Sequence, residues 1–412
     1  MSKLQDLIDR LCPNGVEFKP LGDLLDYEQP TKYIVCSTEY DNNYKTPVLT
    51  AGQSFILGYT DETEGVFPAS KEKPVIIFDD FTTSFHWVDF PFKVKSSAMK
   101  ILYPKTKSVN FKYIHYAMQC IGFVPGEHTR YWISKYSRFT IPLPPLEVQE
   151  EIVRILDRFA DYAAELQAEL QARKEQYEYY RNLLLTFNPS AYGSGTDDEQ
   201  KDDITRWGGR SYKIQWKKMG EIGTFIRGNG LQKKDFTESG VGCIHYGQIY
   251  THYGTFADET KSFVSEKLAK SLLKVESGDI VLACTSENIE DVAKAVAWLG
   301  KDTIVTGGHS VVFKHKENPK YIAYFFQTAL FFNQKKKYAY GAKVIDIKTD
   351  DLAKIEIPVP PKELQEKIVA ILDRFETLVN DLSKGLPAEI EAVKAQYEYY
   401  RNKLLTFKDV AG

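Results

Sequence analysis

Residue types that could carry catalysis occur in this chain without the spacing that catalysis requires. The seven histidines lack metal-ligand spacing, and neither an HExxH pair nor a GxxxxGK[ST] phosphate loop is present. The glycine pairs in Gly228-Asn229-Gly230 and Gly307-Gly308 are more typical of turns than of a phosphate cradle. The five cysteines are scattered, so we expect reduced, mostly buried thiols. The sequence therefore predicts no catalytic site and no metal site.

Polar, aromatic and basic loops between the hydrophobic runs offer a different chemistry. Arg, Asn, Gln and His side chains can pair with base edges, whereas Lys and Thr suit phosphates. Any one such loop has a competing interpretation as a solvated connection. The strongest candidate is the lysine run from Lys335 to Lys343, which includes Tyr338 and Tyr340. The candidate nucleic-acid contacts are Gln53, Thr83, His86, Arg130, Arg227, Asn229, Gln232, Lys233, Lys234, Tyr246, Gln248, Asn288, Lys336, Lys337, Tyr338 and Lys343.

The charge of the chain permits nucleic-acid binding without requiring it. The net charge is -3, whereas a nucleic-acid-binding domain is usually clearly basic. Residues 211–361 carry 21 basic and 17 acidic side chains, residues 147–187 carry 5 and 9, and residues 1–146 carry 16 of each. Local positive faces on the globular parts are compatible with this distribution.

An internal repeat indicates which elements position these loops. Residues 141–187 contain IPLPPLEVQEEIVRILDRF and QYEYYRNLLLTF, and residues 357–407 contain IPVPPKELQEKIVAILDRF and QYEYYRNKLLTF. A weaker echo links VEFKPLGDL at 16–24 with IQWKKMGEI at 214–222. Beyond these strings the two globular segments do not resemble each other. The order is therefore globular segment, helix, linker, globular segment, helix.

Each repeated string predicts a long helix with a coiled-coil seam. Apolar residues recur at alternating steps of three and four after a proline pair that ends the preceding strand. The second seam has two steps of four from Leu382 to Ile390, where Gly385 and Pro387 predict a kink or a helix restart. Two matching seams most simply bury each other as an antiparallel pair, with one globular domain at each end. A generic dimerisation coil is the competing interpretation.

The largely polar and aromatic string QYEYYRN recurs nearly unchanged, which favours a surface for two identical partner copies. Within it, one set of tyrosines follows the seam: Tyr177, Tyr180, Tyr397 and Tyr400. The residues that fall off the seam are the partner-docking candidates: Tyr179, Arg181, Tyr399 and Arg401.

Short extended runs at 74–78 and 279–283 alternate with helical stretches at 111–119 and 319–331, which is typical of α/β or α+β domains. We expect no membrane span and no signal peptide, hence a cytoplasmic protein. The expected divisions are a globular domain at 1–146, a helix at 147–187, a linker at 188–210, a globular domain at 211–361 and a helix at 362–407.

Over its full length the chain resembles the specificity subunit of a type I restriction-modification enzyme. The resemblance rests on two unlike globular domains, each followed by PLPPLxxQxxIxxxLDxF and QYxYYRxxLL, within residues 142–185 and 358–405. It implies a non-catalytic subunit with two target-recognition domains that bind one half-site each of a split double-stranded DNA target. Ala164-Glu165-Leu166-Gln167 and the following Ala168 to Gln171 resemble the tandem tetrads of one subgroup, whereas the second helix has GLPAEIEAV instead.

The resemblance also implies partners. Two methyltransferase (modification) subunits would dock on an antiparallel helix spacer, and motor-nuclease (restriction) subunits would join them for cleavage. These partners, rather than this chain, would bind S-adenosylmethionine, ATP and Mg²⁺. Two other classes stay open: a single-chain DNA-modifying enzyme, which methyl transfer by the lone chain would reveal, and a scaffold that binds protein or RNA, which gel shifts would separate.

The tetrads predict that the length of the first long helix sets the spacing between the two DNA half-sites. Inserting a third Ala-Glu-Leu-Gln after Gln171 advances the helix by about 6 Å and turns it by a net angle near 40°. One base pair of DNA rotates by roughly 35°, so the half-sites should move about one base pair apart while both sequences stay unchanged. Mapping methylated sites of the insertion variant measures this. An unchanged spacing in an active complex would show that the tetrads are ordinary heptad residues.

Overall fold

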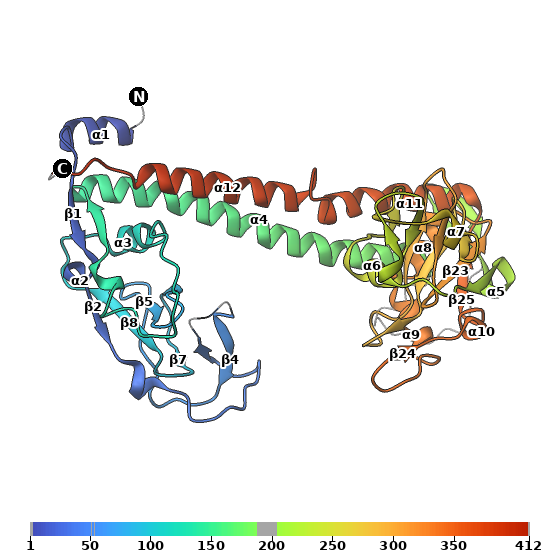
Figure 1. Ribbon diagram of the computed structural model, residues 1–412, viewed down its shortest axis with the longest axis horizontal. Helices are drawn as coiled ribbons and strands as arrows, with labels where there is room; N and C mark the ends of the chain where they lie inside the picture. Colours follow the sequence, from blue (N-terminus) through green and yellow to red (C-terminus); the bar gives the residue numbers. More distant parts are fainter. Residues whose placement is uncertain (1–2, 51, 53, 188–203, 411–412) are drawn as a thin grey trace. The chain divides into compact units, whose positions relative to one another are not determined.

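The computed structural model describes residues 3–50, 52, 54–187 and 204–410. The chain forms two compact units, which we call unit 1 (Met1–Gln167 with Glu389–Gly412) and unit 2 (Ala168–Ala388). Two long helices, α4 (Leu146–Thr186) and α12 (Leu386–Leu404), contribute residues to both units (Figure 1). The sequence-based division into domains, helices and linker stays a prediction.

Unit 1 mixes helices with a four-stranded and a three-stranded sheet. The larger sheet is antiparallel with the order β2-β8-β5-β6, and the smaller has the order β4-β3-β7 with β3 and β7 parallel. The elements are α1 (Lys3–Leu11), β1 (Glu17–Pro20), α2 (Leu21–Leu24), β2 (Leu25–Glu28), η1 (Pro30–Tyr33), β3 (Thr46–Leu49), β4 (Ile56–Thr60), β5 (Val75–Asp79), β6 (Phe85–Val88), β7 (Lys93–Val94), β8 (Met99–Pro104), α3 (Phe111–Met118), η2 (Tyr136–Arg138) and β9 (Thr140–Leu143).

Helix α3 packs between the larger sheet of unit 1 and the start of α4 (Figure 1). Ile114 and Met118 of α3 share one core with Phe78 of β5 and Ile152 of α4. Burying an apolar helix face between a sheet and a second helix is the usual way in which such a layer is stabilised. The predicted strand at 74–78 and the predicted helix at 111–119 are confirmed.

Unit 2 contains two five-stranded sheets, ordered β13-β23-β19-β21-β16 and β14-β17-β15-β22-β18. Its strands are β10 (Ile204–Trp207), β11 (Arg210–Lys213), β12 (Gln215–Lys218), β13 (Gly223–Arg227), β14 (Phe236–Thr237), β15 (Val241–Ile244), β16 (Phe256–Ala257), β17 (Ser262–Val264), β18 (Leu273–Val275), β19 (Ile280–Ala283), β20 (Thr285–Ser286), β21 (Lys294–Trp298), β22 (Ile304–Thr306), β23 (Ser310–His315), β24 (Ile345–Asp346) and β25 (Glu356–Val359). Its helices are α5 (Met219–Ile222), η4 (Lys233–Asp235), α6 (Tyr246–Thr251), α7 (Glu266–Ala269), α8 (Pro319–Phe325), α9 (Ala329–Lys335), α10 (Thr349–Leu352) and α11 (Lys362–Asn380).

The central strand β19 explains why its sequence reads as an uninterrupted apolar run. Ile280 and Leu282 face the core formed with α8 and α11, whereas Val281 and Ala283 face a second core on the other side. Because successive side chains of a strand point to opposite faces, a strand covered on both sides must be apolar throughout. The predicted strand at 279–283 is confirmed, and the predicted helical stretch at 319–331 forms two helices, α8 and α9.

The long helices pair within each unit. In unit 1, α12 runs antiparallel beside α4, with the rings of Phe159 and Tyr400 stacked 5.5 Å apart (Figure 1). In unit 2, Tyr177 and Tyr180 of α4 stack on Phe375 of α11 at 6.1 and 5.6 Å between ring centroids. The predicted α/β (α+β) fold with antiparallel helices is confirmed.

The second long element is interrupted, which confirms the predicted kink or restart. Helix α11 ends at Asn380 and α12 begins at Leu386. A side chain on Gly385 would meet the carbonyl oxygen of Thr377 at 2.4 Å, so the chain needs glycine at this close approach. The interruption exposes Leu382 to 80%, and its prediction as a seam residue is wrong. Tyr400, also predicted for the seam, is 40% exposed.

A matched frame joins each globular part to its long helix. Strand β1 pairs with β9 in unit 1, and β12 pairs with β25 in unit 2. After each second strand, a buried glutamine of the helix, Gln149 or Gln365, donates to a proline carbonyl and accepts the backbone N–H of an asparagine. These asparagines, Asn110 and Asn318, cap α3 and α8.

Helices α3 and α8 themselves are a second repeat that the sequence analysis missed. Residues 110–119 read NFKYIHYAMQ and residues 318–327 read NPKYIAYFFQ. Tyr113 and Tyr321 donate to the carbonyls of Pro142 and Pro358, at 2.9 and 2.7 Å. In this module the two globular segments therefore resemble each other, and the expectation of unrelated segments is wrong here.

The two modules also contact their long helices through matched side chains. The hydroxyls of Tyr116 and Tyr324 donate to Asp157 and Asp373. The last residues of the repeats, Gln119 and Gln327, accept hydrogen bonds of 3.2 Å from Arg401 and Arg181 within their own units. The repeat thus extends from the helices into the globular parts.

Arg401 should stabilise unit 1, whereas its neighbour Tyr399 should not. The guanidinium of Arg401 donates to Gln119 and lies 5.4 Å from the ring centroid of Tyr397, whereas Tyr399 is 60% exposed. We expect Arg401→Ala to lower the free energy of unfolding by about 1–2 kcal/mol. The matched control Tyr399→Ala should change it by less than about 0.5 kcal/mol. Urea unfolding of the two variants makes the comparison, and equal losses would contradict this role for Arg401.

Burial keeps His115 in unit 1 and His315 in unit 2 neutral, so acid should destabilise both units. Burial, assisted by the charge of Lys112, lowers the pKa of His115 to about 4, and burial lowers the pKa of His315 to about 4. Between about pH 6.5 and 4 the unfolded chain binds these protons and the folded chain does not. As the pH is lowered through this range, the free energy of unfolding should therefore fall by up to about 1.4 kcal/mol per pH unit for each histidine.

Urea unfolding at about pH 7 and about pH 5 measures this dependence. His315→Phe, which keeps a ring against Phe313, should flatten it, whereas His252→Phe, at an exposed position, should not. A steep pH dependence that persists in His315→Phe and in His115→Phe would contradict the assignment.

Candidate nucleic-acid and partner interface

In unit 1 the structure brings together three polar and aromatic loops, those that carry Phe55, His86 and Arg130. The ring of His86 stacks on Phe55 at 4.4 Å, and its Nε2 lies 3.3 Å from the carbonyl oxygen of Gly52. Phe81 stacks on His128 at 4.4 Å, which joins the 81–86 segment to the loop that carries Arg130. The predicted contacts His86 and Arg130 therefore belong to one loop cluster, whereas Gln53 lies outside the described residues.

Thr83 belongs to the same cluster but has a conformational role. It is buried, and its φ of 59° places it in the left-handed region that few non-glycine residues adopt. Its N–H donates to the carbonyl of Asp79 in the tight turn after β5. Its assignment to DNA stays a prediction.

A buried ion pair supports the loop cluster of unit 1. Lys100 and Asp80 are 1% and 2% exposed, with Nζ and Oδ2 3.4 Å apart. The other carboxylate oxygen of Asp80 accepts the N–H of Trp132, and its carbonyl accepts that of Tyr131. Because a buried charge is costly unless it is paired and hydrogen-bonded, this arrangement fixes the 127–132 loop against β8. Sequence reasoning missed it, since Lys100 and Asp80 lie 20 residues apart in unremarkable runs.

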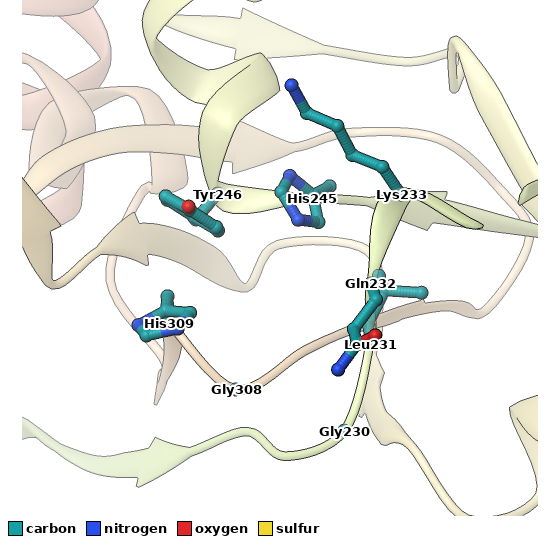
Figure 2. Close-up of a pocket in the computed structure, with 8 residues that line it drawn as sticks. All are labelled: Gly230, Leu231, Gln232, Lys233, His245, Tyr246, Gly308 and His309. Atoms are coloured by element: carbon teal, nitrogen blue, oxygen red, sulfur yellow. The ribbon is translucent and has the colours of Figure 1, made fainter. Parts of the chain in front are cut away.

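In unit 2 a first group of predicted residues lines a pocket of about 350 Å³ (Figure 2). Gln232, Lys233 and Tyr246 were predicted from the sequence, whereas His245 and His309 were not. Asn229 and Lys234, which flank this loop, are exposed. The ring centroids of Tyr246 and His309 lie 4.9 Å apart.

A second group in unit 2 surrounds an ion pair. Arg227 donates to both carboxylate oxygens of Asp346, at 2.7 and 3.3 Å. Asp346 belongs to β24, which pairs with β20 just before the loop of Asn288. The exposed Lys343 lies in the segment that precedes β24. Arg227, Asn288 and Lys343 are thus brought into one assembly, although the Arg227 guanidinium already has a carboxylate partner.

Two predicted contacts in unit 2 are held by other residues of the chain. The side-chain oxygen of Gln248 accepts the N–H of His245, and its amide donates to Ser262 at 2.6 Å. Asn288 accepts the N–H of Asp291 and donates to its carboxylate. Such local bonds are typical of capping and turn residues. The DNA contacts assigned to both stay predictions.

Only part of the lysine run is exposed to solvent. Lys335, included in the run by sequence, is 4% exposed and donates to the carbonyls of Glu290 and Val292, so its place in a DNA-contacting run is wrong. Burial lowers its pKa to about 8. Lys336 and Lys337 are exposed, and Tyr338 is half-buried with the ammonium of Lys354 5.7 Å from its ring centroid.

The four docking candidates divide into two kinds. Tyr179 and Tyr399 are 52% and 60% exposed at equivalent places in the repeat. Arg181 and Arg401 are held by Gln327 and Gln119, and the Nε of each arginine is buried without a partner in the described chain. The docking assignments stay predictions, and the tyrosines are the accessible members.

The described residues contain no helix that is long and apolar enough to cross a membrane. Within the same residues no group of His, Cys, Asp and Glu side chains could hold a metal ion. All five cysteines are free, and Cys12, Cys243 and Cys284 are buried, which confirms the expectation of mostly buried thiols.

Comparisons with known proteins agree with the repeat. The family model described as "Type I restriction modification DNA specificity domain" matches twice, at residues 13–176 and 213–392. The specificity subunit of the Escherichia coli type I restriction enzyme EcoR124I/EcoR124II is 37% identical over 99% of this chain and 97% of its own length. A putative type I specificity subunit of Haemophilus influenzae is 29% identical over 95% of this chain and 96% of its own length.

Solved structures show the same fold. The type I S subunit from M. genitalium has a TM-score of 0.51 at 14% identity, covering 95% of this chain and 96% of its own. A chain from a structure on complex assembly and conformational transition of the type I R-M system has a TM-score of 0.55 at 15% identity, covering 96% and 98%. With both domain copies matched, the chain belongs to the family of type I restriction-modification DNA specificity subunits, the non-catalytic DNA-recognition components of these systems.

Proposed function

We propose that this chain reads a bipartite double-stranded DNA target in the cytoplasm, one half-site through each loop cluster. The cluster of unit 1 contributes His86 and Arg130. The loops of unit 2 contribute Gln232, Lys233 and Tyr246, together with the exposed Lys336, Lys337 and Lys343. Arg, Gln and His present hydrogen-bond groups to base edges, and lysines neutralise phosphates.

One observation carries this proposal: unlike loops stand on a repeated frame. The antiparallel strand pair (β1–β9 or β12–β25), the buried glutamine and the capped helix recur in both units. The sheets above the frame differ, with four and three strands in unit 1 and two sets of five in unit 2. A protein that recognises two different sequences with one architecture needs a constant frame and variable DNA-contacting loops.

The same repeat supports the partners. Tyr179 and Tyr399 expose aromatic rings at equivalent positions, and tyrosine is enriched at protein interfaces. We assign them to the docking of two methyltransferase subunits, with motor-nuclease subunits joining the assembly. S-adenosylmethionine, ATP and Mg²⁺ belong to those partners in this proposal.

Replacing the recognition segment of one unit should change only one half-site of the DNA target. The β1–β9 ladder closes the base of the unit 1 domain, so residues 23–139 can be replaced by those of another family member without altering either strand. We expect the half-site read by unit 1 to change completely and the other half-site to persist. Mapping methylated sites in cells that express the chimera with its methyltransferase subunits measures both.

The matched control is the reciprocal chimera, in which residues 223–354 are exchanged between β12 and β25. It should change the other half-site. A chimera in which both half-sites change at once would contradict independent reading by the two units.

A further inference from the structure

The pocket of unit 2 forms where its two five-stranded sheets meet. β15 and β22 are parallel neighbours, with Ile244 opposite Thr306, and the Thr306 hydroxyl donates to the Ile244 carbonyl at 2.6 Å. The residues that follow these strands, His245 and Gly307, are therefore placed side by side. After Gly307, Gly308 and His309, the chain enters β23 of the other sheet.

Glycines allow a third loop to lie directly on this junction. A side chain on Gly307 would meet Cβ of Leu231 at 2.2 Å, and one on Gly228 would meet the carbonyl oxygen of Gly307 at 2.4 Å. Gly230 has a φ of +74°, a conformation that glycine adopts without strain. The two glycine strings, which the sequence predicts to form turns, thus pack against each other and form one wall of the pocket (Figure 2).

His245 presents a fixed hydrogen-bond donor at this place. Its Nδ1 accepts the N–H of Gly247 at 3.1 Å. Burial, followed by the charges of Lys233 and His309, lowers its pKa below the ordinary value. The ring is therefore neutral at pH 7, and its single proton must sit on Nε2. Within the described part of the chain, no group accepts that proton.

The remaining lining residues favour an anion. Lys233 supplies a positive charge, Gln232 and His309 supply further donor groups, and none of the eight lining residues is a carboxylate. A concave site with donors suits a group that projects from DNA, and the backbone phosphates project, whereas base edges are recessed in the grooves.

We propose that this pocket binds a backbone phosphate of the DNA bound by unit 2, with His245 as a neutral donor and Lys233 as the charged one. The inference rests on the proposed function and deepens it by assigning the pocket to positioning rather than to base recognition. Phosphate contacts fix the register of a protein on DNA and carry no sequence information directly.

Two substitutions separate the two roles. His245→Asn keeps a side-chain oxygen that can cap Gly247 but removes the Nε2 donor. It should weaken binding of the full chain, assembled with its methyltransferase subunits, roughly tenfold for every DNA sequence, with an unchanged salt dependence. Lys233→Gln should weaken binding and lower the slope of log K against log salt by about one. Fluorescence anisotropy at several salt concentrations, on cognate and random duplexes, measures both effects.

The controls are His252→Asn and Lys267→Gln, exposed substitutions outside the pocket lining, which should bind like the wild type. A changed half-site on methylation mapping of His245→Asn would overturn the proposal in favour of base reading. Unaltered DNA binding by both pocket variants would also overturn it, as expected if the pocket held a free phosphate compound instead. If the wild-type assembly bound no DNA specifically, the proposed function itself would fail, and the two failures are thereby distinguished.

Discussion

The structure depends on one buried glutamine near the start of α4 and another near the start of α11. Gln149 and Gln365 are 2% and 0% exposed, and each bonds both to the proline carbonyl that ends a strand and to the asparagine that caps a helix. A buried amide must satisfy its donors and acceptors, because unpaired polar groups in the interior are costly. The strand, the capped helix and the long helix are therefore held in one geometry in each unit.

This frame separates support from recognition. The chain leaves the frame after β1 or β12 and returns to it at α3 and β9, or at α8 and β25, so the segments between these elements can vary without disturbing the helix junction. In unit 1 the variable segments form a loop cluster that the buried Lys100–Asp80 pair supports. In unit 2 they form a pocket between two sheets and the Arg227–Asp346 assembly. The same architecture thus presents unlike chemical surfaces.

Charge counting is a poor guide to the surface of this protein. Lys93 and Lys100 are buried against carboxylates, Lys335 is buried against carbonyls, and Arg227 is paired with Asp346. These four basic side chains therefore have partners within the protein. Other basic side chains, such as those of Lys233 and Lys343, are exposed.

The sequence by itself determined the repeat, the long helices, the break before Leu386 and the apolar strands, because each depends on local periodicity or on proline and glycine. It also located most loops of the candidate interface. Only the tertiary structure decided which loop residues are accessible: it buried Lys335 and Thr83 and gave Gln248 a capping role. It alone brought His245 to His309, 64 residues away, because the pairing of β15 with β22 depends on long-range contacts that no local pattern records. The NxKYIxYxxQ repeat of α3 and α8 was visible in the sequence, but its meaning depends on hydrogen bonds to distant strands and helices.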